Sequence, residues 1–411
     1  MKSKFLIALS AATVAGSVFA ASTEGGNRPR GFKFLGDNLT LTPYVNLAYT
    51  YDTNIDQVHK NVHDSIFLVT PGGELKYDNK DGFVVDAKVF YTHKWYKQHS
   101  GLNQNSYGES FHIEKNTSKK GEKGWSFVFR ERYAKYGQND DMTKSDGRGI
   151  WRDREQIGVN GAIQRRFGDR FHATINGAYD WLDYENDKKK YGKLYGWTRY
   201  SAGVEFGYGL TDLTDLLVAG SYQKYTHSKG YASAYNSISD SSQGWTLMGG
   251  VGSRLDRQIT YRALLGASWF EYGRHHHDAG WTYQLSANWK VTDRLNVALL
   301  GSSYYQPSES VAASANKVYS LSAGARYRFT DRITGSADVA YRKDDRVYTN
   351  RDFSKYTRNE DYACARIRGD WYFNRYASLY AAFEYEWVDY DGSSYLSYNR
   401  CRGTVGVQLH W

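Results

Sequence analysis

The sequence predicts an all-β fold, a transmembrane antiparallel β-barrel of about 18 strands, with limits of 16–20. Three observations predict it. Apolar and polar residues alternate with a period of two from Asn38 to the last residue, as in strands whose two faces meet different surroundings. Tight turns recur along this part of the chain at regular steps. A short apolar segment with the features of an export signal precedes the alternation.

The composition excludes other large classes of protein. The chain has 411 residues with a mean hydropathy of −0.68, and after the first 20 positions it holds no apolar run of the length that a membrane-spanning helix needs. Aromatic residues at 16% with only 4 Pro contradict intrinsic disorder. The net charge of +9 is spread along the chain, so no nucleic-acid partner is expected. Two cysteines are too few for a disulfide framework.

The amino-terminal segment predicts secretion. Lys2 and Lys4 precede an apolar stretch, and Val18-Phe19-Ala20 ends it with a small residue suited to cleavage. We therefore expect residues 1–20 to be a signal peptide cleaved near Ala20, 21–37 to be a flexible periplasmic lead-in, and 38–411 to form the barrel. An even number of strands returns both termini to the same side, which predicts that both are periplasmic.

The last segment shows the alternation most plainly. One face carries apolar or small residues and the other is wet: the first holds Cys401, Gly403, Val405, Val407, Leu409 and Trp411, and the second holds Arg400, Arg402, Thr404, Gly406, Gln408 and His410. Runs of this kind predict strands starting near residues 39, 65, 83, 106, 125, 154, 171, 197, 215, 244, 259, 281, 295, 317, 333, 361, 376 and 397.

The turns between these runs share a composition. Asp or Asn beside Arg recurs in the segments 167–170, 255–257, 291–294, 329–332 and 373–375, and 210–212 is a looser copy. Each step from one such turn to the next holds two strands and one longer polar connection. Short turns at one end and long loops at the other are typical of outer-membrane barrels.

A β-sandwich and a β-propeller also alternate, but both fit less well. A sandwich fills its apolar face with Val, Ile and Leu, whereas here Tyr and Trp gather near strand ends, where a bilayer interface favours them. A propeller repeats every four strands, and the unit here is two. Because an unpaired strand edge in hydrocarbon is costly, the first strand must pair with the last. The terminal Trp411 resembles the aromatic signal read by the barrel-insertion machinery.

The first two predicted strands, Leu39 to Ile55 and Asp64 to Leu75, resemble the opening of the putative beta-barrel porin 2 family. Members of that family are Gram-negative outer-membrane barrels, some encoded near exopolysaccharide biosynthesis genes. The resemblance implies an outer-membrane location and a link to exopolysaccharide export. It supplies no catalytic residues.

A barrel of this size is wide enough for water, so the polar face is expected to line the lumen. The candidate lining residues concentrate in the carboxyl-terminal quarter: Arg326, Arg328, Arg342, Arg366, Arg368, Arg400, Arg402, Asp338, Asp370, Glu384 and Glu386. One interpretation is an arginine track that favours anions or anionic sugars. The other, which we favour, is a cross-strand ladder of salt bridges that stiffens the wall.

Other chemistry finds little support. The segment 275–278, three His and an Asp, is the only metal-suggestive cluster, and neither a metal nor a cofactor is expected. No catalytic motif is recognisable, so no enzyme is predicted. The Tyr- and Lys-rich connection 184–195 favours an ordinary loop, with glycan or cell binding as the alternative.

The expected function is a porin-like channel for passive passage of small hydrophilic solutes, weakly anion-selective or linked to exopolysaccharide export. The alternative is a non-conducting structural or adhesive barrel that uses its surface loops. The expected partners are outer-membrane lipid, small solutes or polysaccharide, and the insertion machinery.

Overall fold

The computed structural model describes the chain in fourteen stretches, and the statements below concern these residues. They are 31–35, 38–56, 61–79, 81–117, 124–136, 153–168, 170–184, 196–227, 241–253, 258–272, 276–307, 315–349, 355–391 and 397–411. The predicted signal peptide and most of the predicted lead-in lie outside them, as do the turn at 255–257 and most of the connection 184–195.

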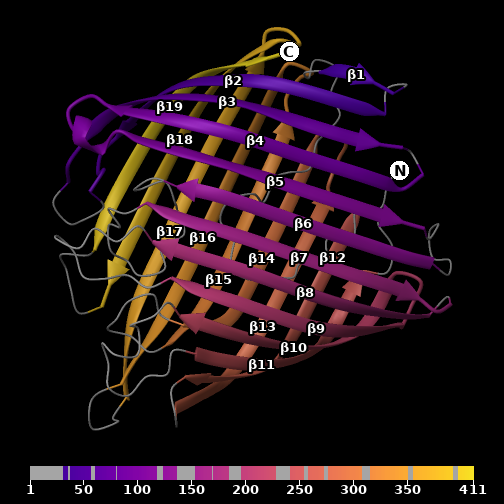
Figure 1. The fold of residues 1–411 in the computed structure, drawn as a ribbon. Coiled ribbons are helices and arrows are strands. Elements are labelled where there is room, and N and C mark those ends of the chain that lie inside the picture. The colour runs from indigo at the N-terminus through magenta and orange to yellow at the C-terminus, as the bar shows by residue number, and fades with distance from the viewer. Residues whose placement is uncertain are drawn as a thin grey trace.

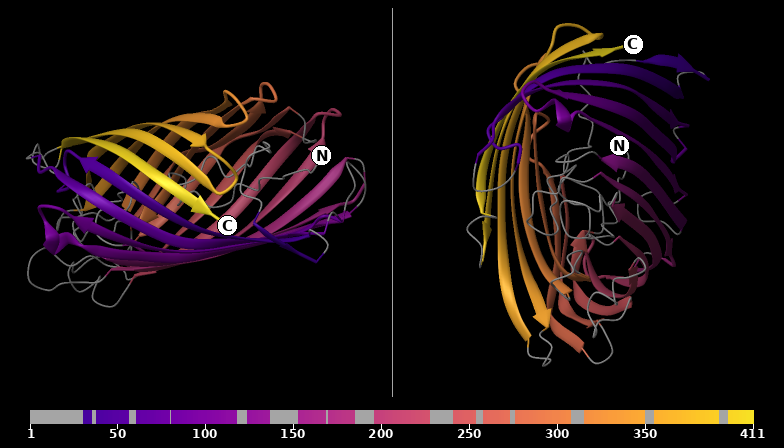
Figure 2. Two further views of the ribbon diagram at one scale, coloured as in Figure 1. Left: turned by 90° about the horizontal axis from the view of Figure 1, so that it is seen from above. Right: turned by 60° about the vertical axis from the view of Figure 1, so that its left-hand side comes forward.

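The structure is a closed antiparallel barrel of 18 strands, β2 to β19, in which each strand pairs with its neighbours in sequence. β19 pairs with β2 from Arg402↔Asp52 to His410↔Tyr44, and this pairing closes the ring. The early strands form one side and the late strands the other (Figure 1), and the ring is seen closed in Figure 2. The predicted fold class is confirmed.

The strands of the barrel are mostly 13 to 15 residues long. In order they are β2 Leu39–Asp52, β3 Asp64–Asp78, β4 Phe83–Tyr96, β5 Gln104–Asn116, β6 Gly124–Tyr136, β7 Arg154–Arg166, β8 Phe171–Tyr184, β9 Trp197–Gly209, β10 Thr214–His227, β11 Ser241–Ser253, β12 Ile259–Tyr272, β13 His276–Lys290, β14 Leu295–Pro307, β15 Ala315–Arg328, β16 Ile333–Thr349, β17 Lys355–Tyr372, β18 Ala377–Tyr390 and β19 Tyr398–His410.

Two short elements complete the fold. β1, Phe32–Phe34, pairs with the start of β2, so this part of the segment predicted as a flexible lead-in is a strand instead. A 3-10 turn, η1, covers Ser100–Leu102 between β4 and β5. The described part of the chain holds no helix with the length and apolar character that a bilayer crossing requires.

Most of the short turns lie at one end of the barrel, which also holds Leu39 and Trp411 and which we call the turn end. The opposite end, which we call the loop end, holds most of the longer connections, although the connection 273–275 between β12 and β13 is short. Trp411 donates its backbone N–H to the carbonyl of Pro43, at 3.1 Å, so the last residue is fixed to the first barrel strand.

Threonine hydroxyls hold several of the tight turns, whereas in the turn 373–375 the side chain of Asn374 accepts the backbone N–H groups. Thr292 Oγ1 accepts hydrogen bonds from the backbone N–H groups of Arg294 and Leu295, at 3.1 and 2.9 Å. Thr330 does the same in its turn, at 3.2 and 3.0 Å. The Asp that follows the Thr makes no such contact with the turn backbone. Asp293 is exposed, and a hydrogen bond from Lys290 lowers its pKa from the ordinary value. The residue before the Asp therefore does the structural work.

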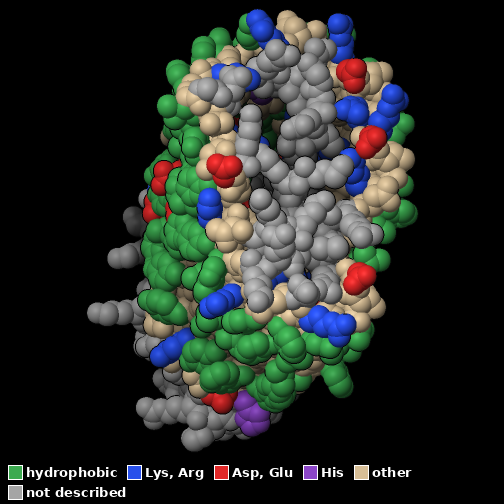
Figure 3. Space-filling view, turned by 90° about the vertical axis from the view of Figure 1, so that its right-hand side faces the viewer, with side chains coloured by type: hydrophobic (Ala, Val, Ile, Leu, Met, Phe, Trp, Pro, Cys, Tyr) green, Lys and Arg blue, Asp and Glu red, His purple; other side chains and the backbone are tan. Residues whose placement is uncertain are grey.

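The two strand faces differ as the alternation predicts. Large apolar side chains such as Val405 (53% exposed), Ile367 and Phe383 lie on the outer face. Charged side chains such as Arg400 and Glu386 lie on the opposite face and are buried. Figure 3 shows hydrophobic side chains covering the flank of an oval molecule, with charged ones around the opening at its end.

Candidate functional site: the charged inner wall of β15 to β19

The most buried charges of the inner wall lie where the barrel closes. The guanidinium of Arg400 on β19 donates to both carboxylate oxygens of Asp52 on β2, with Nε at 3.0 Å from each. Its Nη1 lies 3.5 Å from Glu386 Oε2 on β18, and Tyr398 donates its hydroxyl to Glu386 Oε1 at 2.9 Å. All four side chains are nearly inaccessible to solvent. The first and last strands are therefore joined by a buried ion pair as well as by backbone hydrogen bonds.

A second cluster lies on the same face, two residues closer to the turn end along β18 and β19. Glu384 on β18 stands between two arginines: Arg366 of β17 donates from Nε and Nη2 at 2.9 and 2.6 Å, and Arg402 of β19 pairs with the other carboxylate oxygen. One carboxylate thus links three adjacent strands. Charge-assisted contacts of this kind are among the stronger hydrogen bonds.

Three further predicted residues, Arg342, Arg368 and Asp370, pair within their own strands. Arg368 and Asp370 of β17 are in contact at 2.6 to 2.9 Å, and the Arg368 guanidinium lies 4.0 Å from the centre of the Tyr380 ring. Arg342 of β16 makes a two-pronged contact at 2.6 Å with Asp344. Residues two apart in a strand share a face, so these pairs run along the wall instead of across it.

The remaining predicted residues are less tightly held. Asp338 on β16 lies opposite Arg366 in the strand register. Arg326 and Arg328 are on the inner face of β15 and half-buried. Among the residues that the structure describes, Arg326 has no acidic partner within ion-pair distance. The ion pairs of Arg366, Arg400 and Arg402 cross between strands as in the predicted salt-bridge ladder. The pairs of Arg342 and Arg368 instead run along their own strands.

Sequence reasoning missed several members of this wall. Asp52 was not among the predicted lining acids, although closure of the ring places the end of the first strand beside Arg400 and Arg402. Asp344, Arg346 and Glu360 precede the strand start predicted near residue 361, but β16 and β17 extend through this segment, and Arg346 and Glu360 form a buried ion pair. The period-two spacing of residues 342, 344 and 346 was the signal that could have found them.

The metal-suggestive segment belongs to a strand. His276 opens β13 and His275 lies outside the described residues, while Asp278 accepts a hydrogen bond from the Tyr272 hydroxyl at 2.7 Å. Within the described stretches no group of three or more His, Cys, Asp or Glu side chains is arranged to hold a metal ion. Cys364 and Cys401 are free thiols on β17 and β19, with β18 between them.

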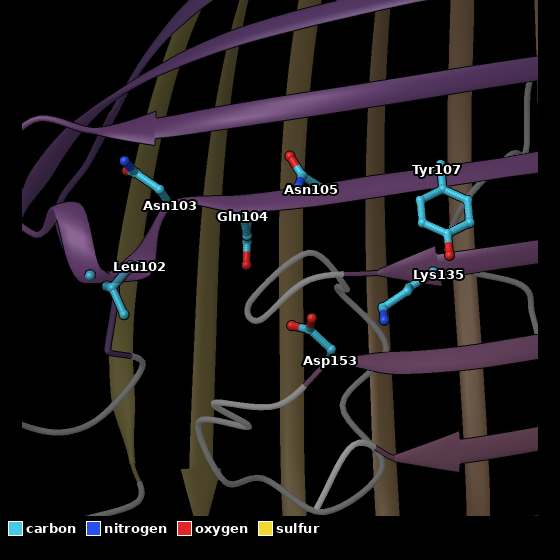
Figure 4. Close-up of a pocket in the computed structure, with 8 residues that line it drawn as sticks. Leu102, Asn103, Gln104, Asn105, Tyr107, Lys135 and Asp153 are labelled. Carbon is cyan, nitrogen blue, oxygen red and sulfur yellow. The ribbon is translucent and has the colours of Figure 1, made fainter. Parts of the chain in front are cut away.

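A polar pocket of about 310 Å³ lies at the loop end, beside the start of β5. Lys135 and Asp153 face its space in Figure 4, near Tyr107 of the neighbouring strand. Tyr107 and Lys135 belong to the outward-facing positions of β5 and β6, so this pocket opens on the outside of the barrel. It is separate from the inner wall.

A closed ring of strands with an apolar outer face and charged residues paired inside defines an outer-membrane β-barrel. The chain matches the family described as Putative beta-barrel porin 2 over residues 35–411, and it belongs to that family. This confirms the resemblance that the first two strands indicated. No curated protein matches the chain.

Among solved structures, the chain is similar to the outer membrane protein OpdK from Pseudomonas aeruginosa, with 13% identity, a TM-score of 0.44, and coverage of 92% of this chain and 100% of that one. It is also similar to a mutant of the ferric enterobactin receptor PfeA from Pseudomonas aeruginosa, with 8% identity, a TM-score of 0.42, and coverage of 93% and 81%. The FrpB iron transporter from Neisseria meningitidis gives 8% identity, a TM-score of 0.43, and coverage of 90% and 82%.

Proposed function

We propose that the protein is a passive, non-enzymatic channel for small hydrophilic solutes. The observation that carries this proposal is the chemistry of the inner face: Arg, Asp and Glu side chains line adjacent strands there, opposite an apolar outer face. Charged side chains on the inside of a barrel need either water or an oppositely charged partner. A barrel of this size has a lumen wide enough to hold water.

The channel is weakly anion-selective. Most lining guanidinium groups are neutralised by a carboxylate at short distance, which removes most of the attraction for anions in the lumen. Arg326 lacks such a carboxylate among the described residues and leaves a local positive charge on the inner face of β15. An uncompensated charge among many neutralised ones gives a small preference instead of a strict filter.

Conductance in planar bilayers tests both statements. We expect stepwise single-channel currents. Under a KCl gradient we expect a reversal potential whose sign shows that chloride permeates better than potassium. Arg326→Ser is expected to shift that potential toward zero, whereas Arg375→Ser, the same change in an exposed turn residue, leaves it unchanged. A clear cation preference contradicts the selectivity. Silence of correctly folded protein favours the non-conducting structural or adhesive barrel.

The turn end faces the periplasm in this proposal, because the first described residues, Trp411 and most of the short turns lie there. Asp212 is exposed at the turn end and Gly101 at the loop end. In a background with Cys364 and Cys401 replaced by alanine, a membrane-impermeant maleimide added to intact cells is expected to label Gly101→Cys and spare Asp212→Cys. Labelling of Asp212→Cys alone reverses the orientation.

A further inference from the structure

The backbone ladder between β13 and β14 covers only part of these two strands. These strands pair only from Gln284↔Ser302 to Lys290↔Asn296, at the turn end. Toward the loop end both strands continue, but each pairs on one side only: β13 with β12 up to His276↔Tyr272, and β14 with β15 up to Pro307↔Ala315. Half of this junction therefore lacks a backbone ladder.

Side chains replace the missing ladder at the point where it stops. Ser303 Oγ accepts the backbone N–H of Tyr283 at 3.1 Å, a contact that a carbonyl makes in a regular sheet. Thr282 donates its hydroxyl to the carbonyl of Ser303, and the two hydroxyl oxygens lie 3.4 Å apart. Thr282 and Ser303 thus hold the junction by side chains that can exchange partners.

Beyond this point the end of β14 lies inside β13. The carbonyl of Tyr305 accepts a hydrogen bond at 3.1 Å from Gln223 on the inner face of β10, three strands away from β13. The Tyr305 ring stacks on Phe270 of β12 with 5.8 Å between centroids and 7° between planes. A side chain added at Gly280 of β13 would meet the Tyr305 hydroxyl at 3.0 Å. Two layers of strand therefore overlap here, with the end of β14 against the inner face of β12 and β13.

The start of β15 follows the same path. Lys317 occupies an outward-facing position of β15, yet its ammonium lies 3.1 Å from Ser268 Oγ on the inner face of β12 and 4.0 Å from the Tyr305 ring centre. It is 5% exposed. The outer surface next to it is open: Trp281 of β13 is 75% exposed and points away from the barrel.

We propose that the β13–β14 junction is a lateral port, closed in this structure by the end of β14, through which amphipathic anions pass between the lumen and the outer leaflet of the membrane. Opening it breaks few backbone hydrogen bonds, because the ladder already ends at Ser302. An open port uncovers the rings of Phe270 and Tyr305 beside the Lys317 ammonium. These groups suit an apolar or aromatic body that carries one negative charge.

The port is tested by locking it. In a background with Cys364 and Cys401 replaced by alanine, Thr282→Cys with Ser303→Cys places two sulfurs where hydroxyls lie 3.4 Å apart. The matched control, Ser302→Cys with Ser320→Cys, bridges hydroxyls 2.9 Å apart across the intact β14–β15 ladder. The probe is 8-anilinonaphthalene-1-sulfonate, an aromatic anion that fluoresces in apolar surroundings, added to cells that produce the protein in the outer membrane.

We expect oxidation of the Thr282/Ser303 pair to slow the protein-dependent rise in probe fluorescence by on the order of tenfold, and reduction to restore it. The control pair is expected to show no change. The KCl conductance of the locked variant stays unchanged, which separates the port from the axial channel of the proposed function. Unchanged probe entry in the locked variant, or a loss of entry that runs parallel with the conductance, overturns the proposal.

A second variant tests the charge of the port. Lys317→Gln removes the charge and keeps an unbranched polar side chain that can still donate a hydrogen bond. It is expected to slow entry of 8-anilinonaphthalene-1-sulfonate more than entry of its uncharged analogue N-phenyl-1-naphthylamine. An equal effect on both probes contradicts the assignment of anions to this port, since a merely structural role of Lys317 affects both alike.

Discussion

At the scale of single residues, the hydroxyl groups of the turn threonines are the least obvious contributors to stability. Thr330 Oγ1 accepts two backbone N–H groups in a turn that otherwise leaves them to solvent. Thr330→Ala is expected to lower the free energy of unfolding by about 1 kcal/mol, the usual net contribution of such contacts. Urea unfolding of the protein from lipid vesicles measures it.

The control for this change is Thr330→Ser, which keeps the hydroxyl and is expected to retain most of the stability. Equal losses in the alanine and serine variants contradict the argument, because they assign the effect to the methyl group. The Asp in these turns was the residue that the sequence pattern singled out. Its side chain is the conspicuous one in sequence, whereas the turn uses the shorter hydroxyl that precedes it.

At the scale of elements, the closure of β2 on β19 depends on a buried charge pair. Arg400→Gln leaves the carboxylates of Asp52 and Glu386 buried without their cation. Removing one partner of such a pair costs about 3 to 5 kcal/mol, so the variant is expected to unfold at clearly lower urea concentration.

Adding Asp52→Asn to Arg400→Gln removes one of the stranded charges and is expected to recover part of the loss. A double variant as unstable as the sum of the two single ones indicates that the residues act independently, which contradicts a pair that closes the ring. Urea unfolding of all three variants under the same conditions supplies the comparison.

The starts of the strands were predictable where the period-two alternation of apolar and polar residues begins at the strand end. The predicted starts of β2, β4, β7, β8, β9, β12, β14 and β16 coincide with the observed ones, because hydrophobic alternation and turn composition agree there. β13 and β17 begin five or six residues earlier than predicted. Their loop ends are polar on both faces, so alternation gives no signal there, and only pairing with the neighbouring strand extends them.

The sequence predicted on which strand face the residues of the candidate site lie, but only partly which ion-pair partner each residue has. The alternation of side chains along a strand shows which face Arg366 or Arg402 occupies, and the structure places both on the inner face. Which carboxylate each one meets depends on the register between strands. The contact of Arg400 with Asp52 joins residues at opposite ends of the sequence, and no local pattern contains it.

At the scale of the whole molecule, charged side chains break the apolar girdle of the outer face on β5 and β6. Glu109 and Glu131 lie near the middle of β5 and β6, on the face that carries exposed Tyr107 and Phe127. Their cross-strand neighbours include Val89 and Val159, which are apolar. Other outward carboxylates, such as Glu271 and Asp389, stand one residue from the loop end of their strands.

Two carboxylates in a lipid-facing girdle should destabilise the barrel in a bilayer. Glu109→Leu with Glu131→Leu is therefore expected to raise the free energy of unfolding from phospholipid vesicles by on the order of 1 kcal/mol for each site, since charged groups lose most hydration near the middle of the membrane. Val89→Leu, an apolar change at a neighbouring outward position, is the control and is expected to have little effect. Because the gain depends on how strongly the surroundings exclude carboxylates, the same double variant should show a smaller gain for protein unfolded from detergent micelles, which adapt to polar groups. A loss of stability in vesicles means that this face of β5 and β6 is covered by protein, and the apolar girdle then surrounds only part of the barrel.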